Sequence, residues 1–157
     1  MINLQTNNKY KRSISQMQLS DKLSRILELA GLDSESNVSV RIDSDELLKN
    51  LNKQYRGFDQ PTDVLSFESN MVDPETGCLF LGDIVISYET AEKQAQEADH
   101  PLENEIILLL IHGILHLSGL DHATKSQKDA MWQKQQMILD KLDVKINRIS
   151  GDKDFHD

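Results

Sequence analysis

Three of the five histidines lie close together, at positions 112, 116 and 122. His112 and His116 are four residues apart in an apolar segment, a spacing that places both imidazoles on one face of a helix, one turn apart. Gly119 permits a sharp turn after that helix, so the chain can fold back and present His122 as a third ligand. Three neutral imidazoles suit zinc, with nickel, copper and iron as alternatives. The pattern therefore predicts one Zn²⁺ per chain, with a coordination position left for water or substrate.

The residue that follows the first histidine decides which chemistry fits this site. Metzincin proteases share the ligand and glycine spacing, and a glutamate after their first histidine is the general base. Here that position is Gly113, which has no side chain. A zinc peptidase or amidase therefore remains an alternative that lacks its usual base. Asp121 is the nearest carboxylate in sequence, and we interpret it as a turn residue or a hydrogen-bond partner of a ligand imidazole.

Basic residues form two candidate patches in a chain whose net charge is -9. This charge argues against a protein that coats nucleic acid non-specifically, so an RNA substrate would require a basic cleft on an otherwise acidic surface. Arg56 lies in a Gly- and Pro-containing loop, and an arginine fork can hold a phosphate through two hydrogen bonds. The alternative for Arg56 is a solvated charge or a salt bridge with Asp59 or Asp63. The patches comprise Lys49, Lys53 and Arg56 in one case, and Lys9, Lys11, Arg12, Lys22 and Arg25 in the other.

Hydrophobic periodicity predicts the elements that would position these residues. Alternating apolar residues predict strands near 2–6, 38–42, 64–67 and 79–86, with a loop over 68–78. Helical spacing predicts five helices, near 17–30, 44–55, 87–98, 101–117 and 126–142, and Tyr55 should close the inward face of the second. Asp43 or Ser44 can cap the second helix, and Ser87 can cap the third. The helix over 101–117 is apolar around most of its circumference and should lie in the core. The fold class expected is α+β, a small mixed sheet of four strands packed against about five helices.

The length of 157 residues suits a single domain, which we place at residues 1–146 with a frayed tail at 147–157. Cys78 is the only cysteine, so neither an internal disulfide nor a disulfide-linked partner is expected. No apolar run approaches the roughly 20 residues that span a bilayer, and no secretory signal is visible. We therefore expect a cytoplasmic protein without a membrane partner. His100 is interpreted as a surface or helix-start residue, and His156 belongs to the tail.

Three segments together resemble the YbeY family of bacterial endoribonucleases. The first is His112-Gly-x-Leu-His116-Leu-x-Gly119-x-Asp121-His122. The others are Leu51-Asn52 with Tyr55-Arg56-Gly57, Asp59 and Pro61 to Phe67, and then Leu81-Gly82-Asp83 to Ser87. The resemblance covers most of the chain from about residue 38 to 143. One departure is Leu120, where family members usually carry tyrosine; this position is not a ligand, so the change concerns local packing.

The resemblance implies a function and a set of partners. Family members are metal-dependent, single-strand-specific endoribonucleases that mature the 3′ end of small-subunit ribosomal RNA and act in ribosome quality control. The expected partners are therefore ribosomal RNA and the small ribosomal subunit, and the expected cofactor is Zn²⁺. A non-catalytic factor in ribosome assembly stays an alternative. The sequence leaves open the oligomeric state and whether water or the RNA 2′-hydroxyl is the nucleophile.

The resemblance also implies roles for particular residues. The metal site of the family lies in a cleft beside a mixed four-stranded sheet, and Arg56 matches the arginine placed in that cleft. His116 and Arg56 are then the expected catalytic residues, and Lys53 joins Arg56 in binding the substrate. Asp63 and Asp83, like Asp121, are candidate hydrogen-bond partners of the ligand histidines, with turn capping as their alternative role.

Overall fold

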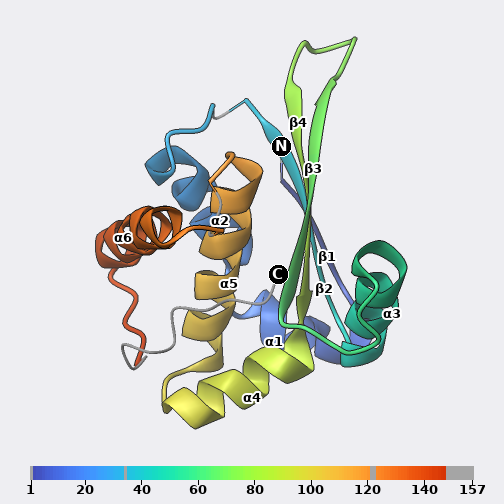
Figure 1. Ribbon diagram of the computed structural model, residues 1–157, viewed down its shortest axis with the longest axis vertical. Helices are drawn as coiled ribbons and strands as arrows, with labels where there is room; N and C mark the ends of the chain where they lie inside the picture. The colour runs from blue at the N-terminus through green and yellow to red at the C-terminus, as the bar shows by residue number, and fades with distance from the viewer. Residues whose placement is uncertain (1, 34, 121–122, 148–157) are drawn as a thin grey trace.

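The computed structural model describes residues 2–33, 35–120 and 123–147, and these residues form an α+β fold (Figure 1). Within them, four strands and six α-helices follow the order that the periodicity predicts, with a short 3₁₀ helix η1 (Asn8–Tyr10) and helix α1 (Lys11–Ser15) added after the first strand. The strands are β1 (Ile2–Thr6), β2 (Asn37–Asp43), β3 (Val64–Val72) and β4 (Leu79–Ser87). The remaining helices are α2 (Leu19–Leu29), α3 (Asp45–Arg56), α4 (Tyr88–Ala98), α5 (Leu102–Leu117) and α6 (Lys125–Leu142).

The sheet is mixed, which confirms the predicted class. The strands lie in the order β1-β2-β4-β3; β1, β2 and β4 are parallel, and β3 pairs with β4 in the antiparallel sense at one edge. Figure 1 shows α5 between the sheet and the pair α2 and α6, while α3 lies against the opposite face of the sheet. Both faces of β4 are therefore covered, one by α5 and the other by α3.

The central position of α5 follows from its composition. Its residues from Glu105 to Leu115 are all buried, which confirms the prediction of a core helix. Apolar side chains of the inner sheet face, such as Val40 and Ile84, join it in the main hydrophobic cluster. Burial of this many large aliphatic side chains is the main source of stability in a fold of this size, at about 1.5–3 kcal/mol for each one fully buried.

Two helices begin where the sequence predicts caps. The Ser44 hydroxyl accepts a hydrogen bond from the Leu47 N–H at the start of α3, and the Ser87 hydroxyl accepts one from the Thr90 N–H at the start of α4. Each bond satisfies an N–H that the first turn of a helix leaves without a partner. Both caps directly follow a strand, so α3 and α4 are fixed to the ends of β2 and β4.

Two local predictions are wrong. The loop expected over 68–78 is shorter, because β3 continues to Val72 and β4 starts at Leu79, with an irregular register between Glu68 and Met71. The outer part of this hairpin extends beyond the body of the protein (Figure 1). Its strands pair with each other there, but the sequence lacks the apolar alternation of a strand with one buried face. Tyr55 does not close the inner face of α3: it is 61% exposed and contacts the Phe67 ring edge-on, with centroids 5.2 Å apart.

Among the described residues, no helix is both long and apolar enough to cross a membrane. The tail predicted at 147–157 lies outside the described residues except for Asn147. That residue donates its backbone N–H to His100 Nδ1 and its side-chain amide to the carbonyl of Asp99.

Candidate metal centre

The two histidines of α5 come together as their spacing predicts. The ring centroids of His112 and His116 are 4.7 Å apart, with the ring planes inclined at 76°. His112 is fully buried, His116 is partly exposed, and the Nε2 atoms of both rings are buried. Two imidazoles on successive turns of a rigid, buried helix are held with little conformational freedom, which favours binding of a common ion.

The helix ends immediately after His116, as Gly119 predicts. The N–H of Gly119 bonds to the carbonyl of His116 at 3.0 Å, and the N–H of Leu120 bonds to that of Leu115 at 3.1 Å. This pair of bonds is a Schellman motif, and Gly119 takes the left-handed conformation that the motif requires, with φ at 101°. Leu120 is partly buried against the main cluster. His122 and Asp121 lie outside the described residues, so the third ligand stays a prediction.

Gly113 lies where a metzincin carries its glutamate, and here the position faces the sheet. A Cβ atom added to Gly113 would stand 3.0–3.1 Å from three side-chain carbons of Ile84. Such contacts are too close for a well-packed core, so α5 approaches β4 closely because this residue has no side chain. A longer carboxylate side chain at this position would have to displace the Ile84 side chain. The packing of α5 on β4 therefore disfavours the usual peptidase base here.

A glutamine from α6 completes the surroundings of His112. The Gln135 Oε1 atom lies 3.1 Å from His112 Nδ1, and both side chains are buried. An amide oxygen can only accept, so this contact favours the tautomer with the proton on Nδ1 and the lone pair on Nε2. This is the tautomer in which a neutral histidine coordinates a metal through Nε2, with its other nitrogen held by an outer partner.

The donor set fits a borderline divalent ion such as Zn²⁺. The two imidazoles lie edge to face one helical turn apart, and Nδ1 of one of them contacts Gln135 Oε1. Within the described ranges, no three His, Cys, Asp or Glu side chains gather as a complete metal site, and the predicted third donor belongs to the gap at 121–122.

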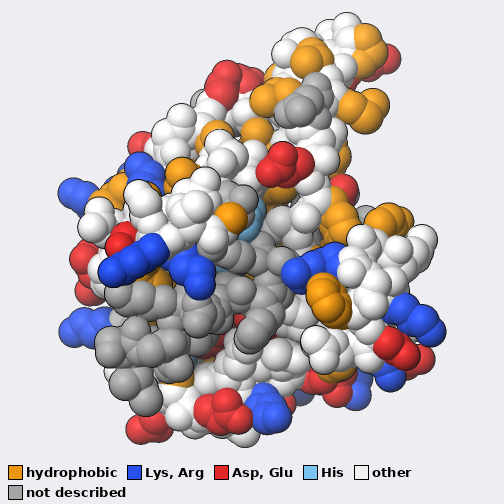
Figure 2. Space-filling view, viewed as in Figure 1, with side chains coloured by type: hydrophobic (Ala, Val, Ile, Leu, Met, Phe, Trp, Pro, Cys, Tyr) orange, Lys and Arg blue, Asp and Glu red, His pale blue; other side chains and the backbone are white. Residues whose placement is uncertain are grey.

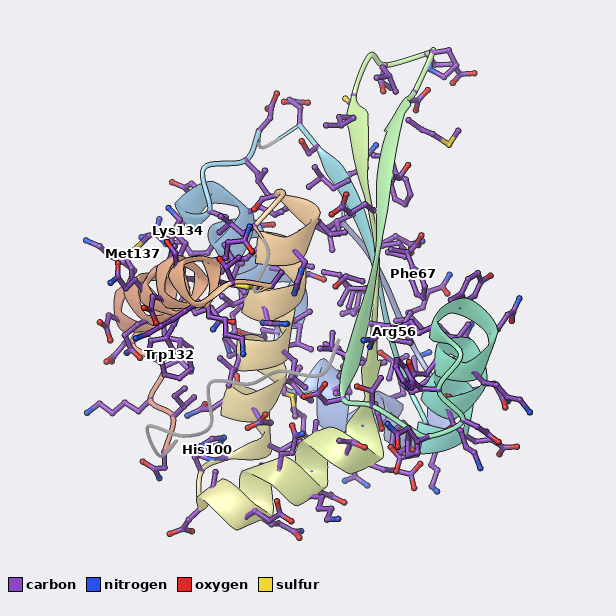
Figure 3. The ribbon with its side chains drawn as sticks, viewed as in Figure 1. Arg56, Phe67, His100, Trp132, Lys134 and Met137 are labelled. Atoms are coloured by element: carbon purple, nitrogen blue, oxygen red, sulfur yellow. The ribbon has the colours of Figure 1, made fainter. Side chains whose placement is uncertain are left out.

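Arg56 is the last residue of α3, and not part of the loop expected from the sequence, because the helix continues up to Gly57; its side chain is exposed. Gly57, with φ at 78°, ends the helix in the left-handed conformation. The guanidinium lies over the Phe58 ring, 5.5 Å from its centroid, and among the described residues it makes no ion pair. The salt bridges considered from sequence do not form, because Asp59 lies near Lys49 and Lys53 instead and Asp63 is buried. Figure 3 shows Arg56 between α3 and β3.

Basic side chains flank the region beside α5. Figure 2 shows Lys and Arg side chains over α6 and beside α3, with histidine surface between them. Lys53 is exposed, and its Nζ atom lies 3.8 Å from Asp59 Oδ2, so that carboxylate partly offsets its charge. The basic cleft expected from sequence remains a prediction.

The remaining candidate carboxylates, Asp63 and Asp83, lie in different surroundings. Asp63 is buried, and its carboxylate accepts from the Val64 N–H and the Gln94 amide, which ties the start of β3 to α4. Asp83 neighbours Ile84 on β4, and because Ile84 points to α5, alternation directs Asp83 to the opposite face. There it lines a pocket of about 450 Å³ together with Arg41, Tyr55 and Phe67. The sheet thus stands between Asp83 and the histidines, which is contrary to its proposed contact with them.

Gln135 is the site residue that sequence reasoning missed. A signal for it does exist: Gln135 falls on the inward face of α6 between the buried residues Met131, Ile138 and Leu139. A polar side chain on such a face needs a buried partner, because an unsatisfied amide costs about 1–3 kcal/mol. The sequence does not show which partner that is, since His112 is 23 residues away.

Comparisons with known proteins identify the family of this chain. The family model described as Endoribonuclease YbeY matches residues 3–143. A relative named Endoribonuclease YbeY from Persephonella marina is 42% identical over 133 residues, covering 83% of this chain and 86% of the relative. One of the same name from Bacillus subtilis is 40% identical over 126 residues, covering 75% and 80%. A Thermotoga maritima protein solved in solution superposes with a TM-score of 0.56 at 26% identity, covering 100% of this chain and 97% of that one. The chain belongs to the YbeY family of endoribonucleases.

Proposed function

We propose that this protein is a zinc-dependent endoribonuclease that cuts single-stranded RNA. In this proposal His112, His116 and His122 hold the ion, and Arg56 binds the phosphate next to the bond that breaks. The observation that carries the proposal is the pair of imidazoles in contact on α5, with Gln135 Oε1 at Nδ1 of His112. Membership of an endoribonuclease family supports RNA as the substrate.

The residues of this chain have separate tasks in the proposed reaction. When bound, Zn²⁺ would supply Lewis acidity at a phosphoryl oxygen or at water. Arg56 holds the phosphate through its guanidinium and offsets the negative charge that develops in the transition state. Its exposure, and its position over the Phe58 ring with no ion pair in the described part of the chain, support this task. Phe58 is itself 51% exposed and offers a face on which a base can stack.

The close packing of Gly113 on Ile84 disfavours the peptidase alternative. A zinc peptidase usually has a carboxylate base next to its first ligand, and here that position is a glycine packed against the Ile84 side chain. RNA carries a 2′-hydroxyl beside each phosphate, so a ribonuclease has two candidate nucleophiles, that hydroxyl and water.

The first experiment measures cleavage of a labelled single-stranded RNA by purified protein. We expect cleavage that stops with a chelator and returns with Zn²⁺, and that falls strongly in His116→Ala and Arg56→Ala. The control is Lys93→Ala, which removes an exposed cation of α4 that belongs to neither candidate basic patch. Equal cleavage by all four proteins would identify a contaminating nuclease and refute the proposal. RNA binding that survives His122→Ala, with chelation that unfolds the protein, would instead favour the non-catalytic assembly factor.

The proposed cellular substrate is the 3′ end of small-subunit ribosomal RNA, in maturation and quality control of the ribosome. A second experiment compares an RNA that spans this end with one in which the scissile nucleotide is 2′-deoxy. Loss of cleavage with the deoxy substrate would assign the nucleophile to the 2′-hydroxyl. Retained cleavage would assign it to water. Failure to prefer the ribosomal end over an unrelated single strand would contradict the cellular substrate.

A further inference from the structure

Gln135 is a polar residue at a position where an apolar one would be expected. It is 2% exposed and lies on the core-facing side of α6, one turn from Met131 and Ile138. A hydrophobic residue of similar volume would fill this space without any amide to satisfy. The presence of glutamine is therefore explained by what its amide contacts.

That contact is the Nδ1 atom of His112, at 3.1 Å across the boundary between α6 and α5. A neutral histidine in solution exchanges between two tautomers, of which one has its proton on Nε2 and cannot coordinate through that atom. An amide oxygen at Nδ1 selects the other tautomer, because it provides an acceptor only to Nδ1–H. The bond also restricts rotation of the His112 ring, which lies edge to face with the ring of His116.

We infer that Gln135 is a positioning residue: it holds His112 as the Nδ1–H tautomer and in the orientation needed to bind a metal through Nε2. Outer partners of ligand histidines typically contribute 10–100-fold to metal affinity, about the size expected here. The inference about the metal rests on the proposed function, whereas the tautomer is a property of the protein without metal. Gln135 touches neither substrate nor ion, and it acts through His112.

Two variants of Gln135 separate positioning from simple packing. Gln135→Met keeps the side-chain volume and removes the acceptor. Gln135→Glu keeps an acceptor oxygen and should retain the contact with His112 Nδ1. The matched control is Gln136→Met, at an exposed neighbour on the same helix whose amide bonds to Asp140 at 2.9 Å. All three changes lie in one turn of α6, so they share any general effect on that helix.

The measurements are the His112 tautomer, from nitrogen chemical shifts in NMR of the metal-free protein, and zinc affinity, from competition with a chelator. We expect Nδ1–H in the wild type, a shift towards Nε2–H in Gln135→Met, and roughly 10–100-fold weaker zinc binding by that variant. Gln135→Glu should lie within about threefold of the wild type, and Gln136→Met should be unchanged.

Several results would overturn the inference. These are Nε2–H as the wild-type tautomer, zinc affinity of Gln135→Met equal to that of Gln136→Met, or no zinc binding by the wild type. If Gln135→Met fails to fold, the wild-type tautomer and the affinity of Gln135→Glu decide instead. RNA cleavage is not among these readouts. A protein whose zinc affinity depends on Gln135 but which cuts no RNA would refute the proposed function and leave the positioning role of Gln135 intact.

Discussion

Two buried histidines, His100 just before α5 and His112 within it, differ in how their ring nitrogens are used. His100, at the junction of α4 and α5 (Figure 3), lies with Nε2 2.7 Å from Glu105 Oε1, and its Nδ1 accepts the backbone N–H of Asn147. Because Nδ1 is an acceptor, the proton of the neutral ring is on Nε2 and is donated to the carboxylate. His112 has Nδ1 on Gln135 and its ring against His116.

The comparison shows that burial alone does not identify a ligand histidine. The two nitrogens of His100 join a helix junction to the segment after α6, so this ring is part of the fold. This corrects the interpretation of His100 as a surface residue, although it does stand at a helix start. His112 has one nitrogen fixed by an acceptor and a second imidazole one turn along. The partner at Nδ1 decides which nitrogen keeps the lone pair, and so which ring is suited to a metal.

The largest difference expected is in metal affinity. His112→Ala should weaken zinc binding at least about 100-fold, since losing a ligand exceeds the loss of an outer partner. His100→Phe should leave the affinity within about twofold, because neither nitrogen of His100 serves the ion. Chelator competition measures both, with circular dichroism to confirm folding. Similar losses in the two variants would break the distinction between the two rings.

For stability, the substitution of His100 is expected to have a large effect. His100→Phe should lower the free energy of unfolding by about 2–4 kcal/mol, because buried Glu105 loses its His100 contact and Asn147 loses an acceptor. Adding Glu105→Leu should recover much of this loss, since an apolar pair replaces a broken polar one. Urea unfolding measures both variants. A loss below about 0.5 kcal/mol would show that His100 does not hold the junction.

A third test concerns Gly113, on the face of α5 that packs against Ile84 of β4. Gly113→Ala should destabilise the protein by about 1–3 kcal/mol, because the new methyl group meets Ile84. Ile84→Ala should cost less in the Gly113→Ala background than in the wild type, since the clash then disappears. Urea unfolding of the double-mutant cycle gives this coupling. Full additivity would mean that α5 can shift, and that the position has room for a longer side chain.

The smallest effect is expected at Asp43, a second buried carboxylate to compare with Glu105. Burial alone would raise the pKa of Asp43, but hydrogen bonds from Asn7, the Ser44 N–H and Arg41 outweigh it and lower that pKa from its usual 3.8. Its contribution to stability is therefore complete above pH 4 or so and is lost as pH falls towards the lowered pKa. Asp43→Asn should cost about 1 kcal/mol at pH 7 and much less near pH 2.5, measured by urea unfolding. A cost that is constant with pH would contradict the direction of the pKa shift.

Local patterns were sufficient for most of the fold. The alternation of β2 and β4, the caps at Ser44 and Ser87, and the glycine that ends α5 all depend on neighbours within a few residues. The spacing of His112 and His116 is local in the same way, because the helix repeat alone brings the two rings together. The β3–β4 hairpin was placed less well, since its outer part is exposed and lacks the apolar alternation of a buried strand.

The sequence by itself determined the α+β class, the apolar helix at its centre and the pair of imidazoles on one side of that helix. Only the tertiary structure decided that Gln135 meets one of those imidazoles, that Asn147 and Glu105 engage His100, and that Asp83 points away from α5. The physical reason is distance along the chain. Periodicity reports which face of an element is buried, whereas the hydrogen-bond partner of a buried polar group depends on how separate elements pack.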